Sequence, residues 1–178
     1  FLLLNQKGFF PDTLRSVIVS PSAYKARTIK PGVGGLYTES EQTVLGQSWD
    51  AGVVILAWDN ARHSAANPND GLNLVLHEFA HQLDQASGAA DGAPILRSRD
   101  RYAEWRKALS QTYRDFLEDT DRGRKTVIDD YGATNPAEFF AVATESFFEK
   151  PRQLKKKRSE LYAELCTYYH TDPLKWAE

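Results

Sequence analysis

Two histidines and a glutamate in one short segment could together activate water on a metal ion. His77 and His81 stand four residues apart, with Glu78 between them, in the segment 73–84, NLVLHEFAHQLD. In a helix of 3.6 residues per turn, side chains at i and i+4 lie on one face, so both imidazoles can reach a single cation. Glu78 is the residue after His77 in the helix, and from there its carboxylate can contact a water bound to that cation. This spacing is typical of sites for metal-assisted hydrolysis.

An alternative is that the pattern arose by accident in a helix whose histidines are packed in the core. The chain has 4 His and 11 Glu, a composition that produces the pattern by chance in roughly half a percent of such chains. The apolar stripe of the segment consists of Leu72, Leu76, Phe79 and Leu83. The opposite side carries His77, His81, Asp84 and Leu74. A helix that already has a core stripe has no packing need for two histidines opposite it, which favours the metal site.

The third ligand must come from elsewhere in the chain, because a catalytic zinc usually has three protein ligands and one water. Sites that take a third histidine six residues after the second need Gly at position 84 and His at position 87. This chain has Asp84 and Ser87, which excludes that class. The remaining common solution is a glutamate from another helix, and the candidates are Glu104, Glu118, Glu138, Glu145 and Glu149.

Glu138 lies in the most apolar helical segment, residues 136–148, where an unpaired charge is costly. It also fits a capping box, with Asn135 as N-cap, Pro136 at the first helical position and Glu138 three residues after the cap. Position alone leaves the ligand and capping interpretations about equal. Glu145 lies two turns later on the same face and is the second choice, or the hydrogen-bond partner of a ligating histidine.

Three sequence blocks are specific in combination: GQSWDAGVVILAWD (46–59), DGLNLVLHEFAHQLD (70–84) and DDYGATNPAEFFAVATESFF (129–148). Together they resemble the Mlc titration factor A family of zinc metallopeptidases, over most of the chain from about Val17 onward. YGATNPAEFF (131–140) also resembles the metal-binding stretch of the anthrax lethal factor protease domain. In both families the glutamate of this block is the third zinc ligand, which implies Glu138 here. The tyrosine seven residues earlier, Tyr131 here, lies beside the metal in those proteins.

The resemblance implies Zn²⁺ held by His77, His81 and Glu138, with water in the fourth position. Glu78 would act as general base, and Tyr131 would donate its hydroxyl to the developing oxyanion. Without the resemblance, Tyr131 reads as an ordinary half-buried tyrosine. Asp84, one turn after His81, is either the partner of an imidazole N–H or a capping or surface carboxylate.

The activity implied by the resemblance is aminopeptidase-like cleavage of short peptides in the bacterial cytoplasm. The alternative is a non-catalytic binding protein that sequesters a transcriptional repressor of the glucose system, and the two roles can coexist. Glu78 favours the enzyme, since a pure binding module needs no base beside the metal. A structural zinc domain would usually close its site with four Cys or His ligands, and this chain offers one Cys.

Composition limits the partners further. With 178 residues and 42% hydrophobic content, the chain can bury one core, and its net charge of −2 gives no reason to expect nucleic acid or membrane as partner. The basic run 150–158, KPRQLKKKR, reads as a solvated helix start.

The single Cys166 suggests a reducing compartment. His63 and His170 have no ligand-spaced partner. The chain contains no Met and begins at Phe1, so we expect part of the natural N-terminal region to be missing.

We expect a single α+β, zincin-like domain over residues 1–178, with a small sheet packed on the His77–His81 helix and further helices toward the C-terminus. Strands are predicted at 16–20 and 52–58, with turns at Pro21, Pro31 and the glycines 32, 34 and 35. The run 52–58 is apolar throughout, which indicates burial on both faces. It is the candidate for the sheet edge that holds an extended substrate, or else a central buried strand.

The remaining segments are predicted from turn residues and helical spacing. Residues 59–71 read as a loop, Asp70 as the N-cap of the histidine-bearing helix and Gly88 as its stop. Residues 88–100 read as an exposed loop. The other predicted helices cover residues 100–118, 136–149 and 159–170.

Overall fold

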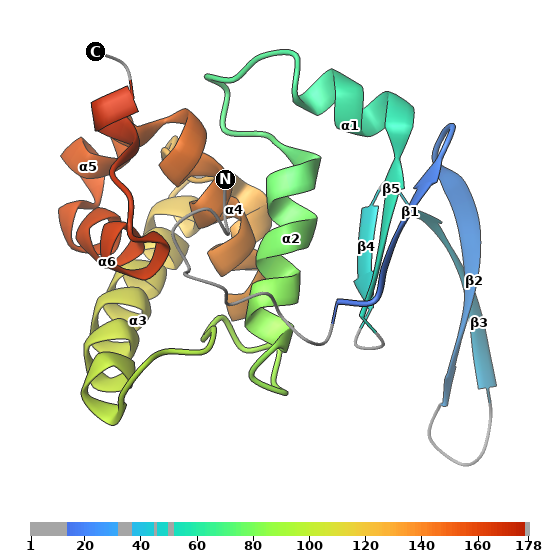
Figure 1. Ribbon diagram of the computed structural model, residues 1–178, viewed down its shortest axis with the longest axis horizontal. Coiled ribbons are helices and arrows are strands. Elements are labelled where there is room, and N and C mark those ends of the chain that lie inside the picture. Colours follow the sequence, from blue (N-terminus) through green and yellow to red (C-terminus); the bar gives the residue numbers. More distant parts are fainter. Residues whose placement is uncertain (1–13, 32–36, 45, 50–51, 177–178) are drawn as a thin grey trace.

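The computed structural model describes residues 14–31, 37–44, 46–49 and 52–176. Its strands are β1 (Ser16–Ser20), β2 (Tyr24–Pro31), β3 (Tyr37–Val44), β4 (Gly46–Trp49) and β5 (Val53–Ala57). Its helices are α1 (Trp58–Ser64), α2 (Leu74–Gln85), α3 (Arg99–Asp121), α4 (Pro136–Glu149), α5 (Pro151–Lys157) and α6 (Ser159–Tyr169), with two 3₁₀ helices, η1 (Asp130–Ala133) and η2 (Pro173–Trp176). Figure 1 shows the strands on one side of the molecule and most helices on the other, with α2 between the two groups.

β5 is the central strand of a three-stranded sheet. β1 pairs with it in parallel, with Ser16 opposite Val53, and β4 pairs antiparallel, with Gly46 opposite Leu56. The strands predicted at 16–20 and 52–58 are therefore confirmed, and residues 54–57 are buried, as the continuous apolar run indicated. Because β5 has a neighbour on each side, the prediction that it is the free edge for a substrate is wrong, and the alternative of a central strand is correct.

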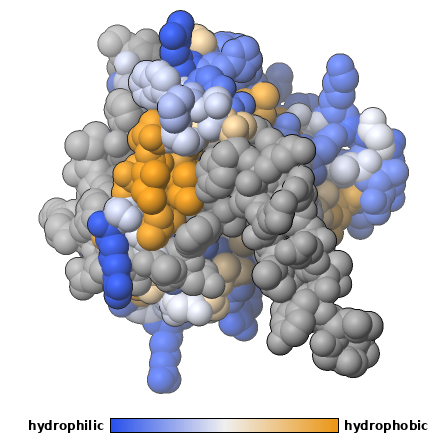
Figure 2. All heavy atoms as spheres, turned by 90° about the vertical axis from the view of Figure 1, so that its right-hand side faces the viewer, coloured by the Kyte–Doolittle hydropathy of each residue, from blue (hydrophilic) through white to orange (hydrophobic). Residues whose placement is uncertain are grey.

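The two edge strands of this sheet, β1 and β4, have different surroundings. α2 contacts β4 and β5, so the β4 border is the one beside the histidine-bearing helix. On the strand side of the molecule, apolar atoms gather in one patch (Figure 2), and the exposed apolar side chains of β1 are Val17, Ile18 and Val19. Gly46 of β4 lines the same cleft as His77 and Glu78, so these two residues of α2 lie on the β4 side of the sheet.

β2 and β3 form an antiparallel hairpin that the sequence analysis did not predict, with Tyr24 opposite Val44. β3 has the sequence YTESEQTV, in which too few apolar residues alternate to mark a strand. The glycines 32, 34 and 35, where turns were expected, lie outside the described residues.

α4 is the centre of the helical half of the molecule. Eleven of its fourteen residues are buried, among them Phe139, Phe140 and Phe147. The ring of Trp105 from α3 meets Phe140 edge-on, with 5.7 Å between ring centroids. A helix that contacts neighbours on all sides must be apolar almost all round. The few carboxylates that α4 carries must therefore find partners inside the protein.

The C-terminal helices follow the predictions closely. α4 and α6 confirm the helices predicted at 136–149 and 159–170, and α3 extends the helix predicted at 100–118 to Asp121. The basic run 150–158 forms the short helix α5, with its lysines exposed. None of the helices in the described ranges is long and apolar enough to cross a membrane.

Two predictions just before α2 are wrong. Residues 59–71, expected as a loop, begin with helix α1. The N-cap of α2 is Asn73, whose Oδ1 accepts a hydrogen bond from the backbone N–H of Leu76 at 3.1 Å. Asp70 instead accepts from the backbone N–H of Leu72 at 3.0 Å, in the turn before the helix. Leu72 is therefore outside the helix and 47% exposed, not part of its apolar stripe.

The segment between α2 and α3 is irregular, as expected, but part of it is buried. Gly92 and Pro94 are buried, and Gly92 has a φ of 79°. A Cβ at Gly92 would lie 2.6 Å from the carbonyl oxygen of Pro136. A side chain at this position would therefore separate the loop from the start of α4.

Candidate metal centre

α2 presents two imidazoles toward the same point. The Nε2 atoms of His77 and His81 lie 3.2 Å apart, and the two rings meet edge to face with 4.8 Å between centroids. The helix that carries them is held at its start by the Asn73 cap and on its other side by Leu83, which is buried in the core. The i, i+4 spacing thus places both side chains on one face, as the sequence predicted.

α4 brings Glu138 to these imidazoles. Its Oε2 lies 3.0 Å from Nε2 of His77 and 3.2 Å from Nε2 of His81. The backbone N–H of Glu138 also donates to Oδ1 of the N-cap Asn135 at 2.9 Å. The two interpretations of Glu138 are therefore compatible, because its backbone joins the helix cap while its carboxylate joins the histidines.

The spacing of these three donors suits a divalent cation. One ligand atom from each of His77, His81 and Glu138 lies within 4.8 Å of the other two, the one such group found in the described part of the chain. Ligand atoms about 2.0–2.1 Å from a tetrahedral zinc are separated by about 3.3 Å, close to the distances of 3.0–3.2 Å seen here. The donor set, two imidazole nitrogens and one carboxylate oxygen, is one that zinc accepts.

The electrostatics of the three residues reflect their proximity. Burial by itself lowers the pKa of His77, but the carboxylates of Glu138 and Glu145 outweigh it and raise that pKa to about 10. Burial by itself raises the pKa of Glu138, but hydrogen bonds to His77 and His81 lower it to about 2. Without a metal, the site is thus a proton-binding cluster in which a cation would displace protons.

Glu145 contacts the other nitrogen of His77. Its Oε1 lies 2.8 Å from Nδ1 of His77, and its Oε2 accepts from the backbone N–H of Asn73. Asn73 in turn donates through Nδ2 to Oε1 of Glu149 at 2.9 Å. A hydrogen bond at Nδ1 fixes the ring orientation and leaves Nε2 available as a ligand. The second choice from the sequence therefore occupies the orienting position, and Glu138 occupies the position among the Nε2 atoms.

The other two glutamates considered from the sequence lie on the surface of α3. Glu104 pairs with Arg101, and Glu118 pairs with Arg122 at 3.4 Å. Neither belongs to the His77, His81 and Glu138 group. Both pairs join residues three or four apart on one exposed helix face, which is an ordinary surface arrangement.

Asp84 does not bind a histidine nitrogen as the sequence analysis considered. It is fully buried, its Oδ2 accepts from the backbone N–H of Gly92 at 3.0 Å, and its Oδ1 has no hydrogen-bond partner. Burial is the main cause that raises the pKa of Asp84 to about 6. The indole N–H of Trp105 donates to the carbonyl oxygen of Gly92 at 3.0 Å. Asp84 and Trp105 therefore hold one glycine between α2, α3 and the start of α4.

Glu78 is buried beside the histidines, with 5% of its surface exposed. Burial is the main cause that raises the pKa of Glu78, to about 7. A Cβ at Gly46 of β4 would lie 2.4 Å from Oε1 of Glu78, so only a glycine leaves room for this carboxylate in its present position. The requirement for glycine at position 46 was not predicted, because β4 and α2 are far apart in the sequence.

Tyr131 approaches the centre from η1. Its ring centroid lies 6.0 Å from that of His77, and its side chain is 55% exposed. Burial against the site, with the nearby carboxylates of Glu138 and Glu78, raises the pKa of its hydroxyl. Asp129 caps η1 by accepting from the backbone N–H of Tyr131 at 2.9 Å. The tyrosine is thus a neutral, protonated donor at the rim of the site.

These residues surround an open cleft of about 470 Å³. The lining residues described in the structure are Gly46, Ser64, Leu72, Asn73, Leu74, His77, Glu78, Asp129, Tyr131, Val142 and Glu145. A ligand in the cleft would therefore touch the candidate base, one imidazole and Tyr131 together.

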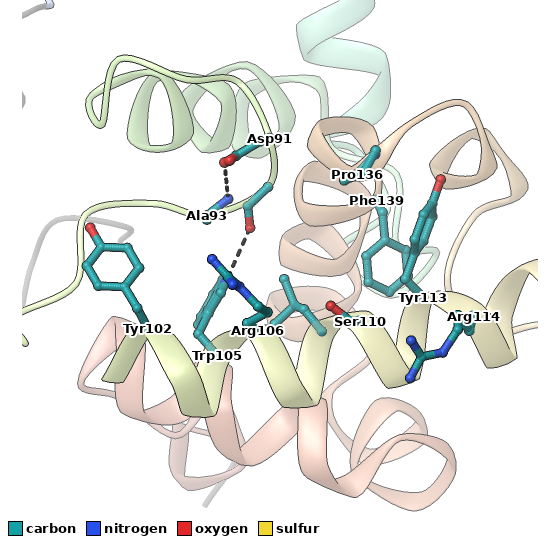
Figure 3. Close-up of a pocket in the computed structure, with 12 residues that line it drawn as sticks. Asp91, Ala93, Tyr102, Trp105, Arg106, Ser110, Tyr113, Arg114, Pro136 and Phe139 are labelled. Carbon is teal, nitrogen blue, oxygen red and sulfur yellow. Dashed lines mark hydrogen bonds between the residues drawn. The ribbon is translucent and has the colours of Figure 1, made fainter. Parts of the chain in front are cut away.

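A second cavity, of about 380 Å³, lies away from the histidines, between α3 and the loop 91–93 (Figure 3). Figure 3 shows Trp105 of α3 on one side of the cavity, and Tyr113 of the same helix beside Phe139 and Pro136 of α4 on the other. None of the three clustered residues lines it. His63, His170 and Cys166 do not belong to the cluster.

The chain matches a metallopeptidase family model and several known proteins over almost its whole length. The model of the family described as glucose-regulated metallo-peptidase M90 matches residues 1–170. An uncharacterized protein of Synechocystis is 42% identical over 162 residues, which cover 90% of this chain and 59% of that protein. Mlc titration factor A of Yersinia enterocolitica is 33% identical over 166 residues, and that of Yersinia pestis is 32% identical over 166 residues.

Both Yersinia alignments cover 92% of this chain, but only 61% and 60% of the two proteins. The chain thus spans about three fifths of the length of these curated relatives. Since the family model covers nearly all of it, and since two histidines and a glutamate converge as a metallopeptidase requires, the chain belongs to the glucose-regulated metallo-peptidase M90 family.

Proposed function

We propose that the chain is a single zincin-like catalytic domain that hydrolyses peptide bonds with zinc. The observation that carries the proposal is the convergence of His77, His81 and Glu138 beside the buried Glu78 at an open cleft. Three protein ligands and an accessible cleft are typical of catalytic rather than structural zinc sites. A buried carboxylate next to such a site has a chemical use in hydrolysis and none in simple metal storage.

The metal would be held by His77 and His81 through Nε2 and by Glu138 through its carboxylate. When bound, zinc lowers the pKa of a coordinated water and polarises the substrate carbonyl. Glu145 supports this arrangement through Nδ1 of His77, 2.8 Å away, because a hydrogen bond there would orient the ring with Nε2 toward the metal.

The chain's own residues move the protons. Glu78, with a pKa of about 7, is suited to accept a proton from the attacking water and to deliver it to the departing amine. Tyr131 keeps its hydroxyl proton, because its pKa lies above the ordinary value, and can donate that hydrogen to the developing oxyanion. Both side chains line the same cleft, as the two roles require.

An extended peptide would bind along the free border of β4. β4 pairs with the central strand β5 at the end of the described sheet, and α2 lies against it. Peptides add to such borders through main-chain hydrogen bonds. Gly46 at the start of β4 adjoins Glu78, which would bring the peptide backbone past the base.

Two finer assignments are proposed, the first from the family resemblance of the sequence and the second from the name of the relatives. We propose aminopeptidase-like cleavage of short peptides as the activity. The printed name of the Yersinia relatives, Mlc titration factor A, supports a second role in which the protein binds a repressor. Because the chain spans about three fifths of those proteins, repressor binding can depend on segments beyond it.

The test is turnover of a panel of short fluorogenic peptides by the purified chain. Zinc-loaded protein should cleave members of the panel, 1,10-phenanthroline should stop cleavage, and added Zn²⁺ should restore it. A zinc-loaded, folded protein that cleaves no peptide would refute the enzyme. Tight binding of a repressor by that inactive protein would instead support the binding role.

A further inference from the structure

The cleft beside the candidate metal site has acidic side chains in its lining. Among its described lining residues there is no lysine and no arginine, whereas Glu78, Asp129 and Glu145 are acidic. Glu145 is bonded to His77, and Glu78 is the candidate base beside the histidines. Asp129 is the remaining acidic residue of the cleft, and the proposed mechanism gives it no part.

The carboxylate of Asp129 is fixed in place. Its Oδ1 accepts the backbone N–H of Tyr131 at 2.9 Å, at the start of η1. Its Oδ2 accepts no hydrogen bond from the described part of the chain, and the residue is exposed to solvent. It stands two residues from Tyr131, whose ring is 6.0 Å from that of His77. A fixed, unneutralised charge at this place attracts a cation more strongly than a mobile one does.

We infer that Asp129 is the cation subsite of this cleft and binds a positively charged group of the substrate. This inference rests on the proposed peptidase function. The group is either the α-ammonium of a short peptide or the side-chain cation of lysine or arginine, since a carboxylate binds both through charge-assisted hydrogen bonds. The charge of Asp129 also repels a carboxylate placed beside it, so the substrate presents its amino-terminal part or a basic side chain to this residue.

The test compares Asp129→Asn with Asp130→Asn. Asn keeps an oxygen that can cap the N–H of Tyr131 but removes the charge. Asp130 is the exposed neighbour in η1 and does not line the cleft, so its variant controls for net charge. Four peptides are needed: one with only neutral side chains and one with lysine next to the cleaved bond, each with a free and an N-acetylated amino terminus.

The expected result is an increase in KM of about tenfold for Asp129→Asn, with an unchanged kcat and little effect of Asp130→Asn. If the increase appears only for free amino termini, the α-ammonium is the ligand. If the increase in KM appears only for the two peptides that contain lysine, the basic side chain is the ligand. Equal effects on all four peptides, no effect, or the same effect in both variants would overturn the inference.

A binding measurement keeps this inference separate from the enzyme assignment. The same peptides can be titrated calorimetrically into zinc-loaded Glu78→Gln protein, with and without Asp129→Asn. Charge-dependent binding that Asp129→Asn weakens, in a protein that shows no turnover with Glu78 intact, would retain the subsite and reject the peptidase. Turnover without any dependence of binding on Asp129 would reject the subsite and retain the peptidase.

Discussion

Glu145 lies 2.8 Å from Nδ1 of His77, on the side of the ring opposite the 3.0 Å contact between Nε2 and Glu138. Both carboxylates come from α4, two turns apart on one face. One helix therefore contacts both nitrogens of a single imidazole, Nε2 through Glu138 and Nδ1 through Glu145. This arrangement separates the roles of two glutamates that sequence position alone could not distinguish.

We expect Glu138→Gln to lower zinc occupancy far more than Glu145→Gln does. Loss of Glu138 removes a ligand, whereas loss of the charge on Glu145 weakens the orientation of His77, an effect of about 10–100-fold in metal affinity. Zinc content after dialysis against a graded competitor chelator measures the difference. A larger loss in Glu145→Gln would show that the two carboxylates have been assigned the wrong way round. Glu104→Gln, on the surface of α3, is the control.

Replacing the base should stop the reaction without releasing the metal. In Glu78→Gln we expect peptide cleavage to fall by about 10²–10⁴-fold, the usual contribution of a general base. Zinc content should stay at the unmutated level, because Glu78 is not among the three clustered donors. Turnover and elemental analysis of the same preparation check both points. Retained turnover would contradict the proposed mechanism.

The histidine spacing and the amphipathic pattern were sufficient to predict that α2 carries two of the three clustered donors. His77 and His81 converge because the i, i+4 relation is local to one helix. The contact with Glu138 joins residues 61 positions apart in the sequence. Periodicity carries no information on that contact, and the resemblance to a family was needed to choose Glu138.

The cap of α2 and the partner of Asp84 could not be predicted from the sequence, because both depend on contacts between distant segments. Asn73, not Asp70, caps α2 because its backbone and side chain also bond to Glu145 and Glu149 of α4. Asp84 holds Gly92 rather than a histidine because the loop after α2 folds back against α4. A local reading of turn residues identified plausible caps, but tertiary contacts decided which of them was used.

Tyr131 should affect the rate and not the stability. Since its side chain is 55% exposed, Tyr131→Phe removes a hydroxyl without opening a core cavity. We expect kcat to fall by about 10²–10³-fold, as on losing one oxyanion donor, with zinc content and the midpoint of urea unfolding unchanged. Steady-state kinetics and urea titration test this. A fall in zinc content would show that the tyrosine helps to hold the metal.

Gly46 should be needed for the position of the base. A Cβ at this residue would lie 2.4 Å from Oε1 of Glu78, so in Gly46→Ala the carboxylate must shift. We expect kcat to fall at least about tenfold, because a displacement of about 1 Å can cost 10²-fold in rate. Zinc content and the midpoint of urea unfolding of the same variant check that a lower kcat does not come from lost metal or lost stability. Unchanged kcat in Gly46→Ala would show that Glu78 acts from another position.

The pH dependence of stability should report the buried Asp84. Its pKa is raised from 3.8 to about 6 in the folded protein, so ionisation opposes folding. Its contribution is most favourable below the unfolded-state pKa of 3.8 and is lost as the pH rises through about 6. Asp84→Asn keeps an acceptor for the N–H of Gly92 and cannot ionise. The stability of this variant relative to the original should therefore rise by about 2 kcal/mol between pH 4.5 and pH 7.5.

Urea unfolding of both proteins at the two pH values, with a chelator present throughout, measures the change. A difference that stays constant with pH would show that Asp84 is ionised without penalty in the folded protein.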